Sequence, residues 1–251
     1  MSVTEARAVA ATAPAERLLA FDTATETLSV ALLANGRSAC IDGDGGALAS
    51  QRLLPCIRQL LADAGVTLQQ LQAIGFGRGP GAFTGLRTAC AVAQGLAFGA
   101  ALPVLPVDSL LIVAEDARMA VADDGDRAID IDVVMDARMG EVYAATYRWA
   151  GGRWTAAVPP ALSTLDALHA QWAKRAPQVV AGTALGAFGD ALQTAGARRI
   201  AESRSRSAAL LRLAQQQWRT GAGVAAADAL PLYLRDKVAL TTAQRAQAAP
   251  A

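Results

Sequence analysis

The sequence predicts an α/β protein built from two related halves. Two β-meanders carry this prediction, one over residues 18–41 and one over 131–158. Each has an apolar strand, an acidic residue at its end, a polar turn and a return strand. The same order of features in both halves suggests an internal duplication. The chain has 251 residues, of which 53% are hydrophobic, so it can bury a substantial core.

The first meander opens with the apolar run 18–21 and reaches Asp22, where the polar stretch 23–27 begins. A return strand over 28–33 ends near Asn35–Gly36, a dipeptide that favours tight hairpin turns. A third strand is expected through residues 39–41.

A helix follows, because apolar residues recur at spacings of three and four. Pro55 falls inside this span, where it either lies in the first turn or kinks the helix, and Gly65 ends the helix. The residues with the helical period are Leu53, Leu54, Ile57, Leu60 and Leu61.

A strand over 73–76 leads into the glycine-rich stretch GRGPGAFTG, residues 77–85, and a second helix follows over about 86–98. This order can direct backbone N–H groups and a helix N-terminus at an anion. Pro80 between two glycines fixes a tight turn, and Thr84 is placed to cap the helix. The spacings of a P-loop and of a dinucleotide fingerprint are both absent.

Two rows of small residues mark the second helix. From the spacing alone, packing of these rows inside the chain is the interpretation we favour, and one row facing a partner chain is the alternative, which the family resemblance described below favours. The rows are Ala89, Ala93 and Ala97, and Ala91, Gly95 and Gly99.

The rest of the chain predicts an edge strand over 102–107, because of its prolines, and a helix from Asp108 or Ser109 to Arg118. A polar turn over 123–126 separates the halves. In the second half we expect strands over 131–135, 142–149, 154–158 and 179–183, helices over 162–172 and 207–218, and an extended segment over 232–235. The predicted organisation is a flexible tail over 1–16, subdomains over 17–122 and 123–240, and a second tail over 241–251.

Charge and cysteine content exclude several classes of protein. With 23 basic and 22 acidic residues, the chain lacks the positive excess of an autonomous tRNA binder. We interpret the arginines at positions 198, 199, 204, 206 and 212 as a solvated face of a helix. Three cysteines without a CxxC pair indicate reduced thiols in a cytoplasmic protein, and a lone His169 argues against a metal site. No apolar run is long enough to span a membrane, and the start lacks the pattern of a signal peptide.

The turn after the first strand places a carboxylate and two hydroxyls together, at Asp22, Thr23 and Thr25. In actin-like ATPases such a turn faces the nucleotide phosphates and their metal. A turn stabilised by its own side-chain hydrogen bonds is the alternative. Gly79, Gly81 and Thr84 of the glycine loop would complete this nucleotide-loop-like set. The corresponding turn of the second meander, which we call the second turn, carries Asp136, Arg138 and Glu141. Arg138 and Met139 are bulky at the place where the backbone would have to approach a phosphate closely, so this turn is a poor phosphate loop.

Four segments resemble the TsaB/YeaZ family and occur in the expected order: DTATETLSVAL, GRGPGAFTGLRTA, MDARMGEVYAA and PLYLRDKVA. The resemblance implies a duplicated actin/hexokinase-like fold, of the ASKHA and ribonuclease-H-like type, with two subdomains. It also implies a non-catalytic partner subunit of a TsaD–TsaB–TsaE complex that forms N6-threonylcarbamoyladenosine in tRNAs reading codons that begin with adenine. The paired metal-binding histidines of TsaD are absent from this sequence.

The same resemblance implies partners: a TsaD-like catalytic subunit, a TsaE-like ATPase, a second copy when the chain is alone, tRNA only indirectly, and no membrane. No cofactor is expected to bind this chain tightly by itself, while ATP or ADP with magnesium is expected at the complex interface. Ala49 stands where many relatives have a histidine, so the contact there differs. The residues expected at the partner interface are Leu53, Ile57, Leu60, Arg87, Ala89, Cys90, Ala93, Gln94 and Ala97.

Two enzymatic functions are the alternatives to a partner subunit. An actin-like ATPase or small-molecule kinase acting alone would use Asp22, Thr23 and Thr25 on phosphate, with Gly182–Thr183 as an adenosine-side remnant. A metallopeptidase would need about three protein ligands around a metal, and the sequence offers no such cluster.

Overall fold

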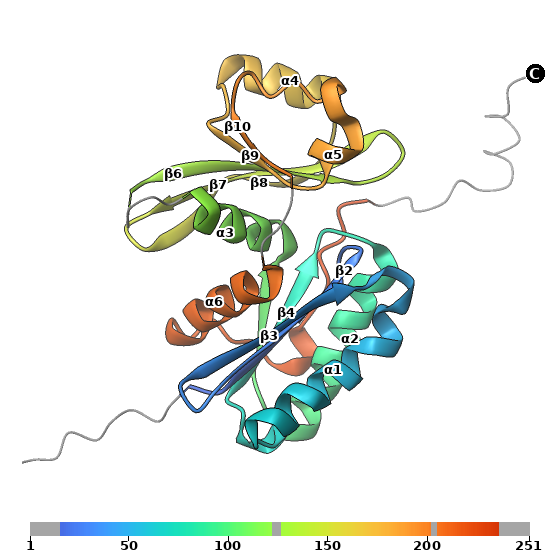
Figure 1. Ribbon diagram of the computed structural model, residues 1–251, viewed down its shortest axis with the longest axis vertical. Helices are drawn as coiled ribbons and strands as arrows, with labels where there is room; N and C mark the ends of the chain where they lie inside the picture. Colours follow the sequence, from blue (N-terminus) through green and yellow to red (C-terminus); the bar gives the residue numbers. More distant parts are fainter. Residues whose placement is uncertain (1–15, 122–126, 202–204, 236–251) are drawn as a thin grey trace, which may run out of the picture.

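The computed structural model describes residues 16–121, 127–201 and 205–235, which form two lobes stacked one above the other (Figure 1). Each lobe is centred on one five-stranded sheet. The strands of the first sheet are β1 (Leu18–Asp22), β2 (Thr27–Ala34), β3 (Arg37–Asp44), β4 (Ala73–Gly79) and β5 (Val104–Asp108). Those of the second are β6 (Ile129–Asp136), β7 (Glu141–Ala150), β8 (Arg153–Thr164), β9 (Val179–Ala181) and β10 (Arg198–Ile200).

The two sheets have the same topology. The first has the order β3-β2-β1-β4-β5, and the second, taken from its other edge, has the order β8-β7-β6-β9-β10. In both, the first three strands in sequence form an antiparallel meander, and the last two join in parallel. This repetition confirms the predicted duplicated actin/hexokinase-like fold. β5 lies at the sheet edge, as its prolines predicted.

Helices cover both faces of each sheet. In the first lobe, α1 and α2 pack on one face and α6 packs on the other. In the second lobe, α3 covers one face and α4 and α5 the other. The helices are α1 (Ala49–Ala64), α2 (Phe83–Ala100), α3 (Ser109–Val121), α4 (Leu165–Lys174), α5 (Ala184–Phe188) and α6 (Arg206–Arg219). Short 3-10 turns lie at Gly46–Leu48, Leu68–Gln70, Gly189–Ala191 and Ala226–Asp228.

The lobes do not follow the chain in order. α3, which lies within the predicted first subdomain, packs against the second sheet through Leu110, Ala114 and Ala117. α6, which lies within the predicted second subdomain, packs against the first sheet through Leu210 and Ala214. α3 and α6 therefore meet in the middle of the molecule, between the two sheets (Figure 1).

Most predicted elements are present. Thr164 caps α4 by accepting a hydrogen bond from the Ala167 N–H. Pro55 lies well inside α1 and not in its first turn. β8 is longer than predicted, and β10 and α5 were not predicted. Of the predicted tails, only Glu16 lies within the described residues, and it forms an ion pair with Arg219.

No helix in the described ranges is long and apolar enough to cross a membrane.

A buried carboxylate, Glu115, fastens the middle layer. It accepts hydrogen bonds from Arg118 of α3 at 3.0 Å, from Arg212 of α6 at 2.7 Å and from the Trp154 indole of β8 at 3.0 Å. Burial by itself would raise the pKa of Glu115, but these hydrogen bonds outweigh it and hold the pKa below its usual value. The ionised carboxylate thus joins three elements that come from both lobes.

We predict that Glu115→Gln destabilises the protein by about 2 kcal/mol at pH 7, since a charged hydrogen-bond acceptor is lost. Because the folded-state pKa is lowered, this stabilisation is present above the unfolded pKa of about 4.3 and is lost as pH falls through the folded pKa. Urea unfolding across pH 3 to 7 should therefore show a difference that shrinks with acid. The control is Asp166→Asn, which changes an exposed carboxylate of α4. A pH-independent difference would contradict the prediction.

Candidate functional site

Asp22 lies at the end of β1, where the fold class places a metal-binding carboxylate, but its oxygens are already bonded. Arg206 at the start of α6 donates to one oxygen at 2.7 Å, and both side chains are buried. The other oxygen accepts from the Ala24 N–H at 3.0 Å and from the Ser109 hydroxyl at 3.3 Å. A buried guanidinium therefore supplies the positive charge that a bound metal would supply, and the residues do not fit a magnesium ion here.

The glycines of the 77–85 stretch are explained by contacts within the chain. A Cβ on Gly77 would lie 2.1 Å from the Asp22 carboxylate, and one on Gly85 would lie 1.8 Å from the Thr23 carbonyl oxygen. A Cβ on Gly81 would meet the Ala24 carbonyl oxygen at 2.3 Å. The first turn therefore packs directly on the glycine loop, and these glycines make room for the protein's own backbone.

The threonines of the predicted loop set are also engaged locally. The Thr23 hydroxyl is buried and donates to the Gly85 carbonyl at 2.7 Å, while the Thr25 hydroxyl bonds within its own turn, to Thr27. Thr84 does not cap the helix: α2 starts at Phe83 with Ala82 at the cap position and no side-chain cap, because the helix begins earlier than predicted. Gly79 has φ +108° and donates its N–H to Ser109 at 3.1 Å. The geometry therefore favours the interpretation in which the first turn is stabilised by its own side-chain hydrogen bonds over the one in which it faces a nucleotide.

The charged side chains of the second turn are likewise paired with other residues of the chain. Arg138 and Met139 have φ values of 64° and 57°, a conformation that side chains rarely adopt. The Arg138 N–H bonds to Asp136, and its guanidinium pairs with Asp136 and, across the lobes, with Glu26, each at 3.2 Å. Glu141 pairs with Arg235 at 2.7 Å. The bulky residues thus close the turn and leave no backbone cradle for a phosphate.

An extended segment over 229–235, which we call the strap, links α2 and the glycine loop to the second turn. It starts at Ala229, whose carbonyl accepts from Cys90 and Gln94 of α2. Leu232 bonds to the Arg78 carbonyl at 2.7 Å. Arg235 then reaches the second lobe and donates to the Ala137 carbonyl at 3.0 Å.

The side chain of Tyr233 completes the strap. Its ring packs on Phe83 with a centroid separation of 5.3 Å, and its hydroxyl accepts from Arg87 at 3.2 Å. Arg87 therefore serves an intramolecular contact from an exposed position on α2.

Most of the residues predicted to face a partner are in the core of the chain itself. They were chosen because the family resemblance places the interface on these two helices, and neither the resemblance nor helical spacing tells which side of a helix meets its own sheet. Of the nine, only Arg87 is exposed and Gln94 half-buried. The buried ones are Leu53, Ile57, Leu60, Ala89, Cys90, Ala93 and Ala97.

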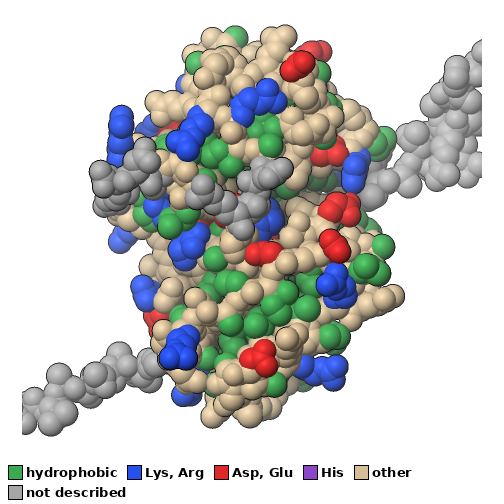
Figure 2. Space-filling view, in the orientation of Figure 1, with side chains coloured by type: hydrophobic (Ala, Val, Ile, Leu, Met, Phe, Trp, Pro, Cys, Tyr) green, Lys and Arg blue, Asp and Glu red, His purple; other side chains and the backbone are tan. Residues whose placement is uncertain are grey.

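The outer face of α1 and α2 is formed by other residues. The second small row, Ala91, Gly95 and Gly99, faces solvent, and Phe98 beside it is 86% exposed. A shallow apolar groove of about 520 Å³ runs between the helices. Figure 2 shows hydrophobic side chains gathered on this lobe, around α1 and β3. The groove is lined by Ser50, Gln51, Leu54, Pro55, Ile57, Arg58, Leu61, Leu68 and Leu96.

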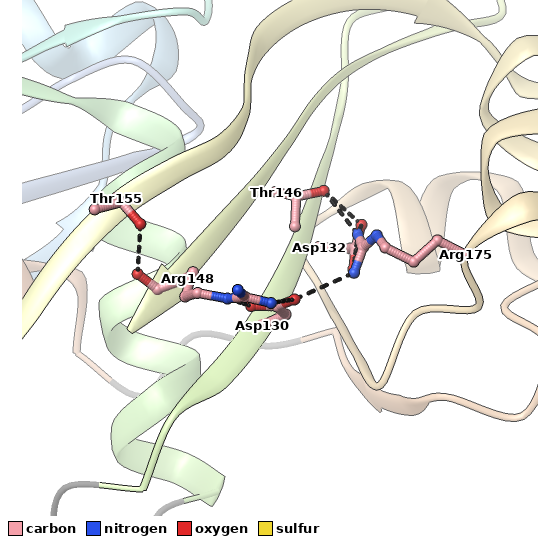
Figure 3. Close-up of polar contacts among 6 residues, drawn as sticks. All are labelled: Asp130, Asp132, Thr146, Arg148, Thr155 and Arg175. Carbon is pink, nitrogen blue, oxygen red and sulfur yellow. Dashed lines mark hydrogen bonds and ion pairs between the residues drawn. The ribbon is translucent and has the colours of Figure 1, made fainter. Parts of the chain in front are cut away.

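Two carboxylates of the second sheet, Asp130 and Asp132, lie close together, and both are paired with arginines (Figure 3). Asp130 accepts two hydrogen bonds from Arg148, at 2.7 and 2.9 Å. Asp132 accepts from Thr146 at 2.7 Å and from Arg175, which follows α4, at 2.9 Å. These contacts fasten α4 to the sheet and leave no pair of free carboxylates.

His169 is structural, since its Nε2 accepts from the Gln193 N–H at 3.1 Å and its ring lies beside Trp172. Across the part of the chain that the structure describes, no group of three or more His, Cys, Asp or Glu side chains could hold a metal ion.

The prediction that the arginines at 198, 199, 204, 206 and 212 form a solvated helix face is wrong, because Arg198 and Arg199 lie on β10 and the two on α6 are bonded within the chain. Arg206 is buried against Asp22, and Arg212 is paired with Glu115. Arg204 lies outside the described residues. Sequence reasoning missed Arg206, Ser109 and Arg235 as parts of the site, because their partners are far away in sequence.

A cleft of about 820 Å³ opens between the lobes, and we call it the interlobe cleft. The first turn, the glycine loop and the start of α2 form its wall on one lobe. The second turn and the end of β9 form its wall on the other. Gly182 and Thr183, considered as an adenosine-side remnant, lie here, and the Thr183 hydroxyl accepts from the Asp136 N–H at 3.2 Å.

Comparison with known proteins gives consistent matches. A family model described as TsaD, tRNA N6-adenosine threonylcarbamoyltransferase, matches residues 48–242. The tRNA threonylcarbamoyladenosine biosynthesis protein TsaB of Escherichia coli K12 is 35% identical over 89% of this chain and 96% of its own length. TsaB of Haemophilus influenzae is 45% identical, over 50% of this chain and about half (51%) of its own length.

Solved structures agree. YeaZ from Pseudomonas aeruginosa matches with a TM-score of 0.77 and 40% identity, over 87% of this chain and the whole (100%) of that one. A second structure from that organism, described as similar to the peptidase YeaZ, has a TM-score of 0.78 at 40% identity, covering 88% and 100% of the two chains.

Two glycines of α2 provide a matched test of the packing explanation. We predict that Gly85→Ala destabilises the protein by at least about 1–3 kcal/mol, the usual cost of overpacking, since its Cβ would overlap the Thr23 carbonyl. Gly95→Ala meets nothing within 4 Å and should stabilise the helix by about 0.5–1 kcal/mol. Urea unfolding of both variants checks this, and equal stability of the two would refute the explanation.

Proposed function

This chain belongs to the TsaB/YeaZ family, and we propose that it acts as a non-catalytic partner subunit in the biosynthesis of threonylcarbamoyladenosine in tRNA. The observation that carries the non-catalytic part is the ion pair between Asp22 and Arg206, 2.7 Å long and buried. It removes the carboxylate that an ATPase of this fold would use to hold a metal. An autonomous ATPase or kinase is disfavoured for the same reason.

We propose a TsaD-type subunit as the partner and the outer face of α1 and α2 as its docking surface. A central apolar groove, exposed side chains such as Leu54 and Phe98, and a row of small residues are features that let another helix pair approach closely. A second copy of this chain would use the same face when the TsaD-type subunit is missing. A TsaE-type ATPase would then join the assembled pair, and tRNA would be bound by the complex.

We further propose that adenine nucleotide with magnesium is held only in the assembled complex. Both carboxylates of the first turn are already paired, Asp22 with Arg206 and Glu26 with Arg138. Side chains of the partner would therefore have to supply the metal ligands. The complex operates in the cytoplasm in this proposal, in agreement with the reduced thiols expected from the sequence.

The docking surface is tested by Gly95→Arg, which places a long cation on the exposed row. Co-purification with a TsaD-type subunit should weaken about tenfold or more, equivalent to about 1.4 kcal/mol, while circular dichroism stays unchanged. Ala170→Arg, on the exposed side of α4 in the other lobe, is the control and should bind normally. Normal binding by Gly95→Arg would reject this surface. Ala93→Arg is unsuitable as a test because Ala93 is fully buried.

The non-catalytic role is tested by ATP hydrolysis with magnesium, using the purified chain alone. We expect no turnover above the buffer background. Hydrolysis that co-elutes with the protein and disappears in Thr25→Ala, a change in a partly exposed side chain of the first turn, would establish the ATPase alternative instead.

A further inference from the structure

The interlobe cleft has the size of a small-molecule site. Its volume of about 820 Å³ lies within the range of about 300–1,000 Å³ that is usual for ligand pockets. Much of its wall is apolar, including Val113, Met135, Ala181, Ile200 and Leu234. A body of apolar or aromatic character would bury well against these side chains.

Arg206, at the cleft floor, has unused hydrogen-bonding capacity. It is only 5% exposed and lines the cleft, and its single hydrogen bond runs from Nη2 to Asp22. Its Nε is buried without a partner. A guanidinium carries five N–H donors, and a buried donor left unbonded is costly. An acceptor group on a ligand would relieve that cost.

Tyr143 offers a second unused group from the opposite lobe. It lies on β7, lines the cleft and is 8% exposed, yet its hydroxyl has no hydrogen-bond partner within the described ranges. Each lobe therefore contributes to the lining of this cavity a largely buried side chain that can form a further hydrogen bond.

The start of α2 adds a third favourable element for an anion. Gly81, Ala82 and Phe83 line the cleft, and the helix has no side-chain cap. Uncapped N–H groups and the helix dipole favour negative charge at this end.

The other charged groups lining the cleft are already matched. Arg138 is paired with Glu26 and Asp136, and Arg235 with Glu141. Asp42 accepts from Ser29, Ser205 and Ser207, and Asp116 accepts from the Ser205 N–H. Arg206 is thus the cation with donors to spare in this part of the cleft.

We infer that the interlobe cleft binds a small organic acid, with one carboxylate or phosphate group on an apolar or aromatic body, and that it does so without a divalent cation. Arg206 binds the acidic group, the α2 N-terminus adds positive potential, and Tyr143 donates to a further oxygen. This site is separate from the docking face of α1 and α2, so binding here does not depend on the partner.

The test uses the purified full chain in EDTA and saturation-transfer NMR with three probes: phenyl phosphate, benzoate and neutral benzyl alcohol. We expect at least one acid to bind and benzyl alcohol to bind at least tenfold more weakly. Phenyl phosphate alone would assign a phosphate head group, and benzoate alone a carboxylate. Arg206→Gln should weaken acid binding about tenfold, and Tyr143→Phe, which keeps the ring, about threefold.

Arg206→Gln also leaves Asp22 unpaired and can unfold the chain, so a second pair of variants is needed. Ala187→Trp fills the cleft from an exposed lining position of α5, whereas Ala191→Trp makes the same change at an exposed position outside the lining. The first should abolish binding and the second should not. Absence of acid binding up to about 10 mM, binding that requires magnesium, or binding unaffected by Ala187→Trp would each overturn the inference. Normal co-purification of Ala187→Trp with a TsaD-type subunit would separate this outcome from a failure of the proposed function.

Discussion

The buried ion pair between Asp22 and Arg206 is the interaction on which the arrangement of this protein depends. It joins the end of β1 to the start of α6, two elements 184 positions apart. Ser109, the first residue of α3, bonds to the same carboxylate. One pair thus fastens the first sheet to both helices of the middle layer. Since breaking a buried ion pair costs about 3–5 kcal/mol, either partner's loss would loosen the contact between the lobes.

The same pair leaves the Asp22 carboxylate bonded within the chain, at the position where actin-like ATPases face a nucleotide and its metal. A carboxylate held by a guanidinium, a hydroxyl and an N–H has no reason to bind a metal as well. The glycines at 77, 81 and 85 then serve the close approach of the first turn to the loop. Features that resemble phosphate-binding elements in the sequence therefore serve the packing of the backbone on itself.

Local sequence patterns were enough to predict the meanders, most helices and the duplication, since strand period, helix period and turn residues are local properties. They could not decide which small row of α2 faces outward. Ala89–Ala93–Ala97 and Ala91–Gly95–Gly99 have the same spacing, and only the sheet beneath determines that the first is buried. Nor could they predict that Arg206 is buried, because its partner Asp22 lies at the other end of the chain. Thr84 was misassigned as a cap because helix starts are known only to within a turn.

α2 borders both of the surfaces proposed above to have a function. Its first turn walls the interlobe cleft, and its outer face borders the apolar groove of the first lobe. The strap fixes this helix to the second lobe. Its Tyr233 packs on Phe83 of α2, and its Arg235 donates a hydrogen bond to the second turn. Because a helix of 18 residues moves as one body, a partner on its outer face contacts the same rigid element that shapes the cleft. One wall of the cleft and the proposed docking face therefore belong to the same helix, although the residues that line the cleft and those that line the groove are different.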